Sequence, residues 1–280
     1  MPELPETETI ARDLEAMVLG ARITQVDVVR PDVLRGGSVA AFRDVLEGGA
    51  LCRVWRRAKC IVLDVATVPA DRRWHVVVQP RFTGGLIVDD GTLAPAERTA
   101  ICATAHLADG RLLYYRDVRR LGTVALMDEA RFASYSAGLG PEPLDPQLTA
   151  EAFSGFIRYS SRPIKVVLMD QRHLAGVGNI YANESLWRAS IDPSRAAASL
   201  TGGACAALLT ALREVLTASI EARGTSFRDY RDARGARGRF VEQLAVYGRA
   251  GLPCPRCGRR LVGTHAVDGR QTVFCPTCQR

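Results

Sequence analysis

The hydrophobic pattern along the chain changes twice, and each change separates segments of different predicted structure. Residues 6–19 carry apolar side chains at the spacing i, i+4, i+7 and i+8 from Ile10, and Gly20 ends the run. This spacing predicts one amphipathic helix. From Ile23 to about Leu126 seven short apolar or alternating runs follow, separated by Gly, Pro and Asp clusters: ITQVDVV, CIVLDV, WHVVVQ, GLIVDD, AICATAHL, RLLYYRD and TVALM. They predict an antiparallel β-sandwich or barrel.

The loop-like stretch GLGPEPL, residues 138–144, marks a domain boundary, and helical periodicity follows it. Helices are predicted over the ranges 149–159, 162–170, 179–188 and 202–222. Residues 224–240 are rich in Gly and Arg without periodicity, which predicts a mobile loop. We therefore expect an α+β protein with three parts: an N-terminal antiparallel β-sandwich with flanking helices at 1–138, a helical domain at 139–240, and a C-terminal cysteine-rich β-hairpin at 241–280.

The charged residues are unevenly distributed along the chain. The 37 basic and 30 acidic residues give a net charge of +7. The segment 223–280 alone contains 12 Arg and 4 acidic residues, so it carries 12 − 4 = +8, and the rest of the chain sums to about −1. A basic segment on a nearly neutral body is typical of a surface that binds a polyanion, although a merely solvated charged face has the same composition.

No segment of the sequence reads as a membrane span or a secretion signal. The longest stretch without a charge, 196–212, is shorter than the roughly 20 apolar residues that a span needs. The first residues, MPELPE, are acidic and lack an apolar run. We expect a cytoplasmic protein, and a monomer, because no coiled coil or additional assembly domain is visible.

Lysine is rare, since only Lys59 and Lys165 occur among the 37 basic residues. Base composition of the genome explains a general replacement of Lys by Arg. A lysine that persists under that bias can occupy a position that requires a compact ammonium able to lose its proton, a property that Arg lacks. Both lysines are therefore candidate functional residues.

The eight cysteines form two groups. Cys52, Cys60, Cys102 and Cys205 are scattered in apolar surroundings and are predicted to be small buried hydrophobic residues. The other group has the spacing C-x2-C-x17-C-x2-C, which is typical of a zinc site with four thiolate ligands: Cys254, Cys257, Cys275 and Cys278. Disulfides are the alternative, but nothing in the sequence indicates an oxidising compartment.

Four thiolates fill a tetrahedral zinc site, so we expect one structural zinc ion. It would hold together a hairpin that is too short for its own core, with Asp268 and Gly269 at the tip and Arg270 beside them. At such a tip an arginine can reach a groove or a phosphate, whereas some zinc ribbons bind proteins instead.

Two further motifs have a functional and a structural interpretation. The turn GVGN, residues 176–179, leads into a helix, where exposed amides and Asn179 could bind a phosphate or simply cap the helix. If Met1 is removed, Pro2 becomes a terminal secondary amine with a pKa of about 7.7–8, which makes it a candidate nucleophile. Glu3 and Glu6 could then transfer protons, although these residues would also suit a plain helix start.

Seven blocks, in order along the whole chain, resemble the formamidopyrimidine-DNA glycosylase family. They are PELPETET (2–9), RRAKCIVLDV (56–65), DVRRLG (117–122), GLGPEPL (138–144), IKVVLMDQRHLAGVGNIYANE (164–184), VYGRAGLPCPRCG (246–258) and GRQTVFCPTCQ (269–279). The start PELPE resembles this branch rather than the endonuclease VIII branch. The resemblance implies that the helical domain is a helix–two-turns–helix domain and that the C-terminal hairpin is a zinc ribbon.

The same resemblance implies a bifunctional glycosylase and AP lyase that excises oxidised purines from duplex DNA. Pro2 matches the amine that attacks C1′ and forms a Schiff base, and Glu3 matches the acid that protonates the sugar ring oxygen. Lys59 matches the lysine that assists β-elimination. Arg270 matches the arginine that holds the lesion phosphates during δ-elimination.

DNA contacts are implied in the same way. Asn179 matches a phosphate contact of the helix–two-turns–helix motif, Lys165 matches a backbone contact nearby, and 224–240 matches the loop that closes over the flipped base. A base inside a duplex is reached only after extrusion, and side chains fill the gap. Arg119 matches the inserted arginine that faces the estranged base.

The remaining wedge positions depart from the family. Phe82 and Leu121 stand where the family typically has Met and Phe. Gln79-Pro80-Arg81 replaces the usual His-Leu-Gly, and the family's histidine near Ala100 is absent. These differences leave the lesion and the opposite base open.

Three functional hypotheses follow. The first is excision of 8-oxoguanine and formamidopyrimidines by the Schiff-base mechanism. The second keeps this mechanism but directs it to oxidised pyrimidines or further-oxidised guanine products. The third, from a different class, is a catalytically silent DNA-damage-binding protein, which failure to trap a covalent complex on abasic DNA would favour. A zinc-ribbon module that binds proteins would differ from all three, because DNA binding through several phosphates weakens steeply with salt.

Overall fold

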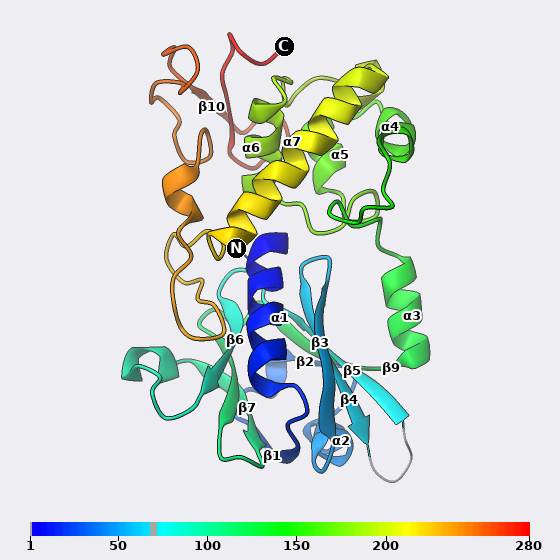
Figure 1. Cartoon of the computed structure of the whole chain (residues 1–280), viewed down its shortest axis with the longest axis vertical. Coiled ribbons are helices and arrows are strands. Elements are labelled where there is room, and N and C mark those ends of the chain that lie inside the picture. The colour runs from blue at the N-terminus through cyan, green and yellow to red at the C-terminus, as the bar shows by residue number, and fades with distance from the viewer. Residues whose placement is uncertain (1, 68–71) are drawn as a thin grey trace. The chain divides into compact units, whose positions relative to one another are not determined.

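The computed structural model describes residues 2–67 and 72–280 and divides the chain into two compact units (Figure 1). The first unit comprises Met1–Ala137 and Ala222–Val241, and the second comprises Gly138–Glu221 and Glu242–Arg280. The expected helical domain included 224–240, whereas the structure groups this segment with the first unit. The reason is its packing, since Tyr230 and Ala233 belong to the core of the β-sandwich.

Two β-sheets form the first unit and confirm the expected β-sandwich. The four-stranded sheet has the order β1 (Ile23–Val28), β7 (Ile101–Leu107), β8 (Leu112–Asp117) and β6 (Gly84–Asp89). The five-stranded sheet has the order β2 (Leu34–Arg35), β9 (Thr123–Asp128), β5 (Arg72–Gln79), β4 (Cys60–Thr67) and β3 (Ala50–Arg57). Every described strand pair is antiparallel except β2 with β9.

Alternation along the strands explains how the sheets pack. On β5, Val76 and Val78 enter the core between the sheets, while Val77 points to the opposite face and contacts the cluster around Phe132. Because successive side chains of a strand point to opposite faces, β4 and β5 each supply residues to both clusters. Phe132 belongs to α3 (Glu129–Ala137), which covers the outer face of the five-stranded sheet.

Helix α1 (Leu4–Val18) places its predicted apolar stripe in the core of the sandwich, through Ile10, Leu14 and Val18. It packs against β3, as Figure 1 also shows. The hydrophobic pattern did not predict the strands β2 and β3, the helix α3 or the short helix α2 (Val39–Leu46). Strand β3 is an edge strand that carries several arginines. The helices α2 and α3 have only eight and nine residues, which is shorter than the window of about 11–18 residues over which helical periodicity is recognised.

The prediction that Cys52 is buried was wrong, because this residue is exposed, whereas Cys60, Cys102 and Cys205 are buried as expected. Cys52 lies on β3, at the edge of the five-stranded sheet. Its thiol donates a hydrogen bond to the backbone oxygen of Asp64, 3.3 Å away.

The second unit confirms the predicted helices. They are α4 (Ala150–Arg158), α5 (Ile164–Met169), α6 (Asn179–Arg188) and α7 (Gly202–Glu221). Helix α7 is long and apolar enough to cross a membrane by length and composition alone. In the fold it packs against α4 and α6, and its buried side chains include Leu208, Leu212 and Leu216, so it serves as the core helix of this unit.

The C-terminal part of the second unit is an antiparallel hairpin of β10 (Val262–Thr264) and β11 (Thr272–Phe274). Its small core contains Val246, Leu261 and Val273 together with two of the cysteines. Short 3-10 turns complete the described structure at Pro31–Val33, Pro95–Arg98, Ala197–Ser199 and Phe240–Gln243.

Candidate active site and thiolate centre

The N-terminal residues are held at the start of α1 by a reciprocal capping arrangement. Pro2 and Glu3 are both buried, and Glu3 is the N-cap of the helix. The backbone N–H of Glu3 donates to Oε2 of Glu6 at 2.8 Å. This is the capping box that an acidic residue at N3 makes with the N-cap, and it fixes the direction in which the chain enters the helix.

Glu6 also joins the N-terminus to the segment that the sequence analysis expected to be a mobile loop. Its other oxygen, Oε1, accepts a hydrogen bond from the backbone N–H of Thr225 at 2.8 Å. A Cβ atom at Gly224, where φ is +84°, would lie 3.0 Å from Cγ of Glu6. One buried carboxylate therefore contacts both the candidate proton donor Glu3 and the first residues of the loop.

Lys59 lies in the tight turn between β3 and β4 and is half-buried. The conformation of Ala58 and the hydrogen bonds of Arg56 both stabilise this turn. Ala58 has a positive φ of 54°, and its backbone oxygen accepts a hydrogen bond from Nη1 of Arg56 at 3.1 Å. The same guanidinium donates through Nε to Glu8 on α1 at 2.8 Å. The hairpin that carries Lys59 is thereby attached to α1, the helix that Pro2 and Glu3 directly precede.

The three residues of the expected wedge lie on two loops of the first unit. Phe82, on the loop between β5 and β6, is 46% exposed, and Leu121, on the loop between β8 and β9, is 42% exposed. Arg119 is also exposed, and its guanidinium carbon lies 4.9 Å from the centre of the Phe82 ring. Large apolar side chains that remain exposed in a folded monomer are typical of an interaction surface.

In the second unit, the side chain of Lys165 is fully buried. Its Nζ donates to Oδ1 of Asp268 at 3.1 Å and to Oγ1 of Thr272 at 2.7 Å. The same Oδ1 accepts a hydrogen bond from the backbone N–H of Arg270 at 3.1 Å. The sequence predicts Lys165 as a DNA contact, whereas here its ammonium contacts the tip of the β10–β11 hairpin.

Asn179 begins α6, as predicted, and also contacts this hairpin. Its Nδ2 donates to the backbone oxygen of Gln271 at 3.1 Å. One turn later, Oδ1 of Asn183 accepts a hydrogen bond from the backbone N–H of Val273 at 2.7 Å. Arg270, which is exposed, is therefore presented on a tip that α5 and α6 hold at three points. The sequence analysis did not single out Asn183, although it stands in the same motif.

Glu184, the next residue, anchors the start of the cysteine-rich segment. Its two carboxylate oxygens accept hydrogen bonds from the backbone N–H groups of Ala245, Val246 and Tyr247 at 2.7–2.9 Å. Three consecutive backbone donors on a buried carboxylate form a rigid joint between α6 and the segment that follows. The motif IYANE therefore contains two residues, Asn183 and Glu184, whose contacts only the tertiary structure reveals.

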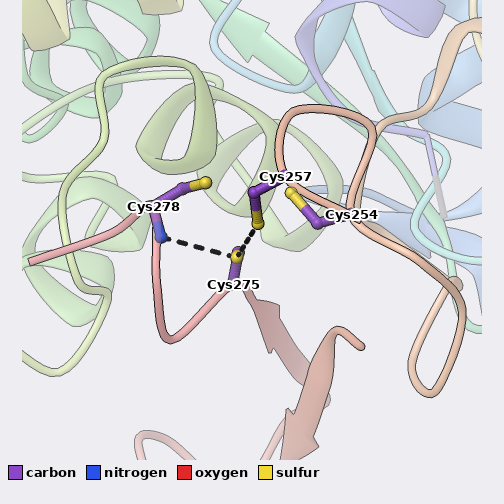
Figure 2. A group of neighbouring side chains, drawn as sticks. All are labelled: Cys254, Cys257, Cys275 and Cys278. Carbon is purple, nitrogen blue, oxygen red and sulfur yellow. Dashed lines mark hydrogen bonds between the residues drawn. The ribbon is translucent and has the colours of Figure 1, made fainter. Parts of the chain in front are cut away.

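The four cysteines of the C-x2-C-x17-C-x2-C motif converge at one place (Figure 2). Their four sulfur atoms all lie within 4.8 Å of one another. Sγ of Cys257 and Sγ of Cys275 are 3.5 Å apart, which is far longer than the roughly 2.05 Å of a disulfide bond. All eight cysteines are free thiols, so the arrangement favours a metal site.

The chemistry of this donor set fits a zinc ion. Burial opposes ionisation of Cys254, but hydrogen bonds from the backbone N–H groups of Arg256 and Cys257 and from the side chains of Trp187 and Cys275 together lower the pKa of Cys254 to about 6. The neighbouring sulfur atoms, Cys257 first, raise the pKa of Cys278 to about 12. Four thiolates can therefore coexist here only around a cation. Four ligands leave no open coordination position, so the protein contains one structural zinc.

Comparison with known protein families matches three successive segments of the chain. Residues 1–124 match the family model of the formamidopyrimidine-DNA glycosylase N-terminal domain. Residues 139–231 match the formamidopyrimidine-DNA glycosylase H2TH domain, and residues 251–280 match the zinc finger found in FPG and IleRS.

Similar proteins cover the full length of the chain. The formamidopyrimidine-DNA glycosylase of Pelotomaculum thermopropionicum is 37% identical over 282 residues, which span 100% of this chain and 99% of that protein. The formamidopyrimidine-DNA glycosylase of Heliobacterium modesticaldum is 40% identical over 287 residues, which span 100% of both chains.

Solved structures of similar proteins also match the full length of the chain. A Lactococcus lactis FPG mutant in complex with DNA that contains Fapy-dG has a TM-score of 0.88 and 31% identity, and the match covers 100% of both chains. The MutM (FPG) protein of Thermus thermophilus has a TM-score of 0.85 and 39% identity, with 99% of this chain and 98% of that one covered.

A β-sandwich, a helix–two-turns–helix domain and a four-thiolate zinc finger together define a DNA repair glycosylase that acts on damaged bases. The chain belongs to the formamidopyrimidine-DNA glycosylase family. Bifunctional glycosylase and AP lyase activity is characteristic of this family. Such an enzyme acts on DNA and therefore inside the cell.

Proposed function

We propose that this enzyme excises oxidised purines, such as 8-oxoguanine and formamidopyrimidines, from duplex DNA through a Schiff base at Pro2, and then cleaves the strand by β,δ-elimination. The observation that carries this proposal is the burial of Pro2 and Glu3 at the start of α1, held by Glu6. The Lactococcus lactis protein bound to DNA containing Fapy-dG supports the choice of lesion.

Two residues perform the first chemical step. The secondary amine of Pro2 attacks C1′ of the damaged nucleotide, and the bond from C1′ to the damaged base breaks. The base leaves with the bonding electron pair and takes up the proton that the amine releases. Glu3 protonates the ring oxygen of the sugar, so the ring opens and an iminium ion forms on Pro2. A terminal amine suits this role because its pKa of about 7.7–8 leaves part of it neutral at pH 7.

Two further residues assist the eliminations. Lys59, on the short β3–β4 turn, assists removal of the 3′ phosphate in β-elimination. Arg270, on the hairpin tip, holds the lesion phosphates and assists δ-elimination. A guanidinium suits this second role because its planar donors match two phosphate oxygens at once.

The remaining predicted residues bind the DNA. Phe82, Arg119 and Leu121 fill the gap that the extruded nucleotide leaves, with Arg119 facing the estranged base. Asn179 contacts a phosphate from the start of α6. We assign Lys165 an indirect part in this binding, since its buried ammonium holds the tip that carries Arg270.

Borohydride trapping tests the proposal directly. The protein is first shown by mass spectrometry to begin at Pro2, because a retained Met1 would turn the amine into an amide. It is then mixed with duplex DNA containing 8-oxoguanine opposite cytosine, and sodium borohydride reduces the iminium to a stable covalent complex. The controls are Pro2→Gly and Glu3→Gln, and we expect the trapped complex to weaken strongly in both.

Each outcome has a distinct meaning. A trapped complex on 8-oxoguanine supports the amine mechanism and the lesion class together. Trapping on a plain abasic site alone keeps the lyase but refutes excision of 8-oxoguanine. Absence of trapping on either substrate refutes the mechanism and favours a catalytically silent damage-binding protein.

A second candidate substrate is an oxidised pyrimidine. The wild-type Lactococcus lactis protein has been solved with DNA containing one, at a TM-score of 0.87 and 31% identity. Phe82 and Leu121, which depart from the family's usual wedge residues, affect the extrusion of either lesion. Incision of matched duplexes that contain 8-oxoguanine or an oxidised pyrimidine, each opposite every base, distinguishes the two. We further propose that the enzyme works at the bacterial nucleoid, as its DNA substrate requires.

A further inference from the structure

A buried carboxylate connects the two loops that carry the wedge. Asp117 ends β8 and is only 1% exposed. Its Oδ1 accepts a hydrogen bond from the hydroxyl of Thr83, the residue that follows Phe82. The same Oδ1 accepts a hydrogen bond from the backbone N–H of Arg119 at 3.2 Å. One oxygen atom therefore contacts both loops.

The second oxygen of Asp117 holds the far end of the Arg119–Leu121 loop. Oδ2 accepts a hydrogen bond from the backbone N–H of Gly122 at 2.8 Å and one from the hydroxyl of Tyr115 at 3.3 Å. Four uncharged donors therefore satisfy both oxygens of this buried carboxylate. The loop that contains Leu121 is thus fixed at both ends by one side chain.

Two glycines allow this close approach. A Cβ atom on Gly84 would lie 2.6 Å from the backbone oxygen of Pro80 and 2.9 Å from the hydroxyl of Tyr115. A Cβ atom on Gly122 would collide with the same hydroxyl and lie 2.7 Å from the backbone oxygen of Gln79. The bases of the two loops therefore meet at Tyr115, with no room for any side chain between them.

The tips of the loops are in contact as well. The guanidinium of Arg119 stacks on the ring of Phe82 at 4.9 Å. The hydroxyl of Thr83 also accepts a hydrogen bond from the backbone N–H of Arg119, at 3.0 Å. The side chains from the two loops are thereby linked at the tips and at the bases.

We propose that Asp117 and Thr83 are positioning residues that join the two loops into one rigid wedge, so that Phe82, Arg119 and Leu121 enter the duplex together. This inference rests on the proposed function of the wedge. Neither residue contacts the reacting atoms in this scheme. Their effect is confined to the step in which the damaged nucleotide leaves the helix, because that step alone requires the gap to be filled.

The test uses Asp117→Asn and Thr83→Val, which keep the shape of each side chain. An amide at position 117 places an N–H group against N–H or O–H donors, and valine removes the hydroxyl that joins the loops. We expect each change to slow single-turnover excision of 8-oxoguanine about tenfold or more, because a hydrogen bond to a charged group contributes about that factor. Thr83→Ser keeps the hydroxyl and should restore the rate to within about twofold.

Two readouts separate positioning from a general loss of structure. Borohydride trapping on a preformed abasic site needs no damaged base to be extruded, so it should change by less than about threefold. A 2-aminopurine base placed beside the estranged base reports unstacking by its fluorescence. In both variants the rise of this fluorescence should slow in parallel with excision. The matched control is Asp90→Asn, since Asp90 also accepts hydrogen bonds from a threonine, Thr92, but in a turn at the other end of β6.

The outcomes distinguish this inference from the proposed function. If the wild type traps and excises while Asp117→Asn and Thr83→Val retain its excision rate, the positioning role is refuted and the proposed function stands. If both variants lose abasic trapping to the same extent as excision, the carboxylate serves the fold and the inference is again wrong. If the wild type neither traps nor excises, the proposed function itself has failed.

Discussion

Lys165→Met tests whether the buried ion pair of Lys165 with Asp268 holds the zinc hairpin in place. The lysine side chain is 0% exposed and that of Asp268 only 10% exposed. Methionine has a similar volume, so packing changes little. The loss is electrostatic, because the carboxylate of Asp268 remains without the cation that faces it. Removing one partner of a buried pair costs about 3–5 kcal/mol, and the partial exposure of Asp268 places this case near 3 kcal/mol.

The loss of stability in Lys165→Met should appear first as local opening of the hairpin rather than as global unfolding. Two of the zinc ligands, Cys275 and Cys278, follow directly after β11, the strand whose first residue, Thr272, bonds to Lys165. The assay is the rate at which a colorimetric chelator removes zinc from the folded protein. If opening limits release, about 3 kcal/mol corresponds to roughly 100-fold faster loss of zinc.

A double-variant cycle makes the prediction specific to charge. Lys165→Met combined with Asp268→Asn removes both charges, and the asparagine oxygen can still accept the hydrogen bond from the backbone of Arg270. We expect zinc release from the double variant to return to within about tenfold of the wild type. Arg162→Met is the matched control, because its ion pair with Asp170 is partly exposed and should change release by less than about fivefold.

Two results would refute this reasoning. Release from Lys165→Met within about threefold of the wild-type rate would mean that the ion pair does not hold the hairpin, since a buried pair of this kind has a much larger expected effect. A double variant that releases zinc as fast as the single variant would mean that the lost methylene packing, and not the unpaired carboxylate, is responsible.

Three shorter predictions concern the thiolate centre, a close-packed glycine and acid stability. Cys257→Ser should lower the zinc content, measured by mass spectrometry of the metal, from one per chain to none, and full retention would contradict a four-thiolate site. Gly122→Ala should lower the free energy of unfolding in urea by about 2 kcal/mol, because its Cβ would lie 2.7 Å from a backbone oxygen, whereas Gly85→Ala, with nothing within 4 Å, should be nearly neutral. Hydrogen bonds from Arg172 hold the pKa of Asp170 well below its usual range, so the stability it adds is present above about pH 4 and is lost as the pH falls. Asp170→Asn should therefore destabilise the protein by about 1 kcal/mol at pH 7 and by progressively less in urea titrations below pH 4, and a constant difference would show that its charge is irrelevant.

Periodicity was a reliable guide where an element was long and had one buried face. The stripe of α1 and the alternation of β4 and β5 reach the core as predicted, because one face of each must leave water. Strand β3 was not predicted because its arginines break the apolar pattern, although its backbone pairs with β4 on both sides of a register shift at Cys52. Short elements such as α2 depend on neighbours that are distant in sequence.

The candidate functional residues also form two groups: those that linear motifs predict and those that only the tertiary structure reveals. The cysteine spacing predicted the thiolate centre because two pairs of ligands, each two residues apart, need only a hairpin to meet. The positions of Pro2, Glu3 and Lys59 could be assigned from linear motifs. The carboxylate of Asp117 could not, since its donors come from residues 83, 115, 119 and 122, which only the pairing of β6 with β8 and the two loops bring together.

The amino-acid sequence therefore predicted the order of the parts, the helices α1 and α4 to α7, most strands, the zinc ligands and the family, but not the helices α2 and α3. Tertiary structure alone decided that 222–241 belongs with the sandwich, that Cys52 is exposed and that Lys165 is buried against the hairpin. The physical reason is the separation along the sequence between the residues that interact. Periodicity and ligand spacing are local properties of the chain. Burial and the partner of a charge depend instead on contacts between residues that are distant in sequence, such as Lys165 and Asp268, which lie 103 positions apart, or Glu6 and Thr225, which lie 219 positions apart.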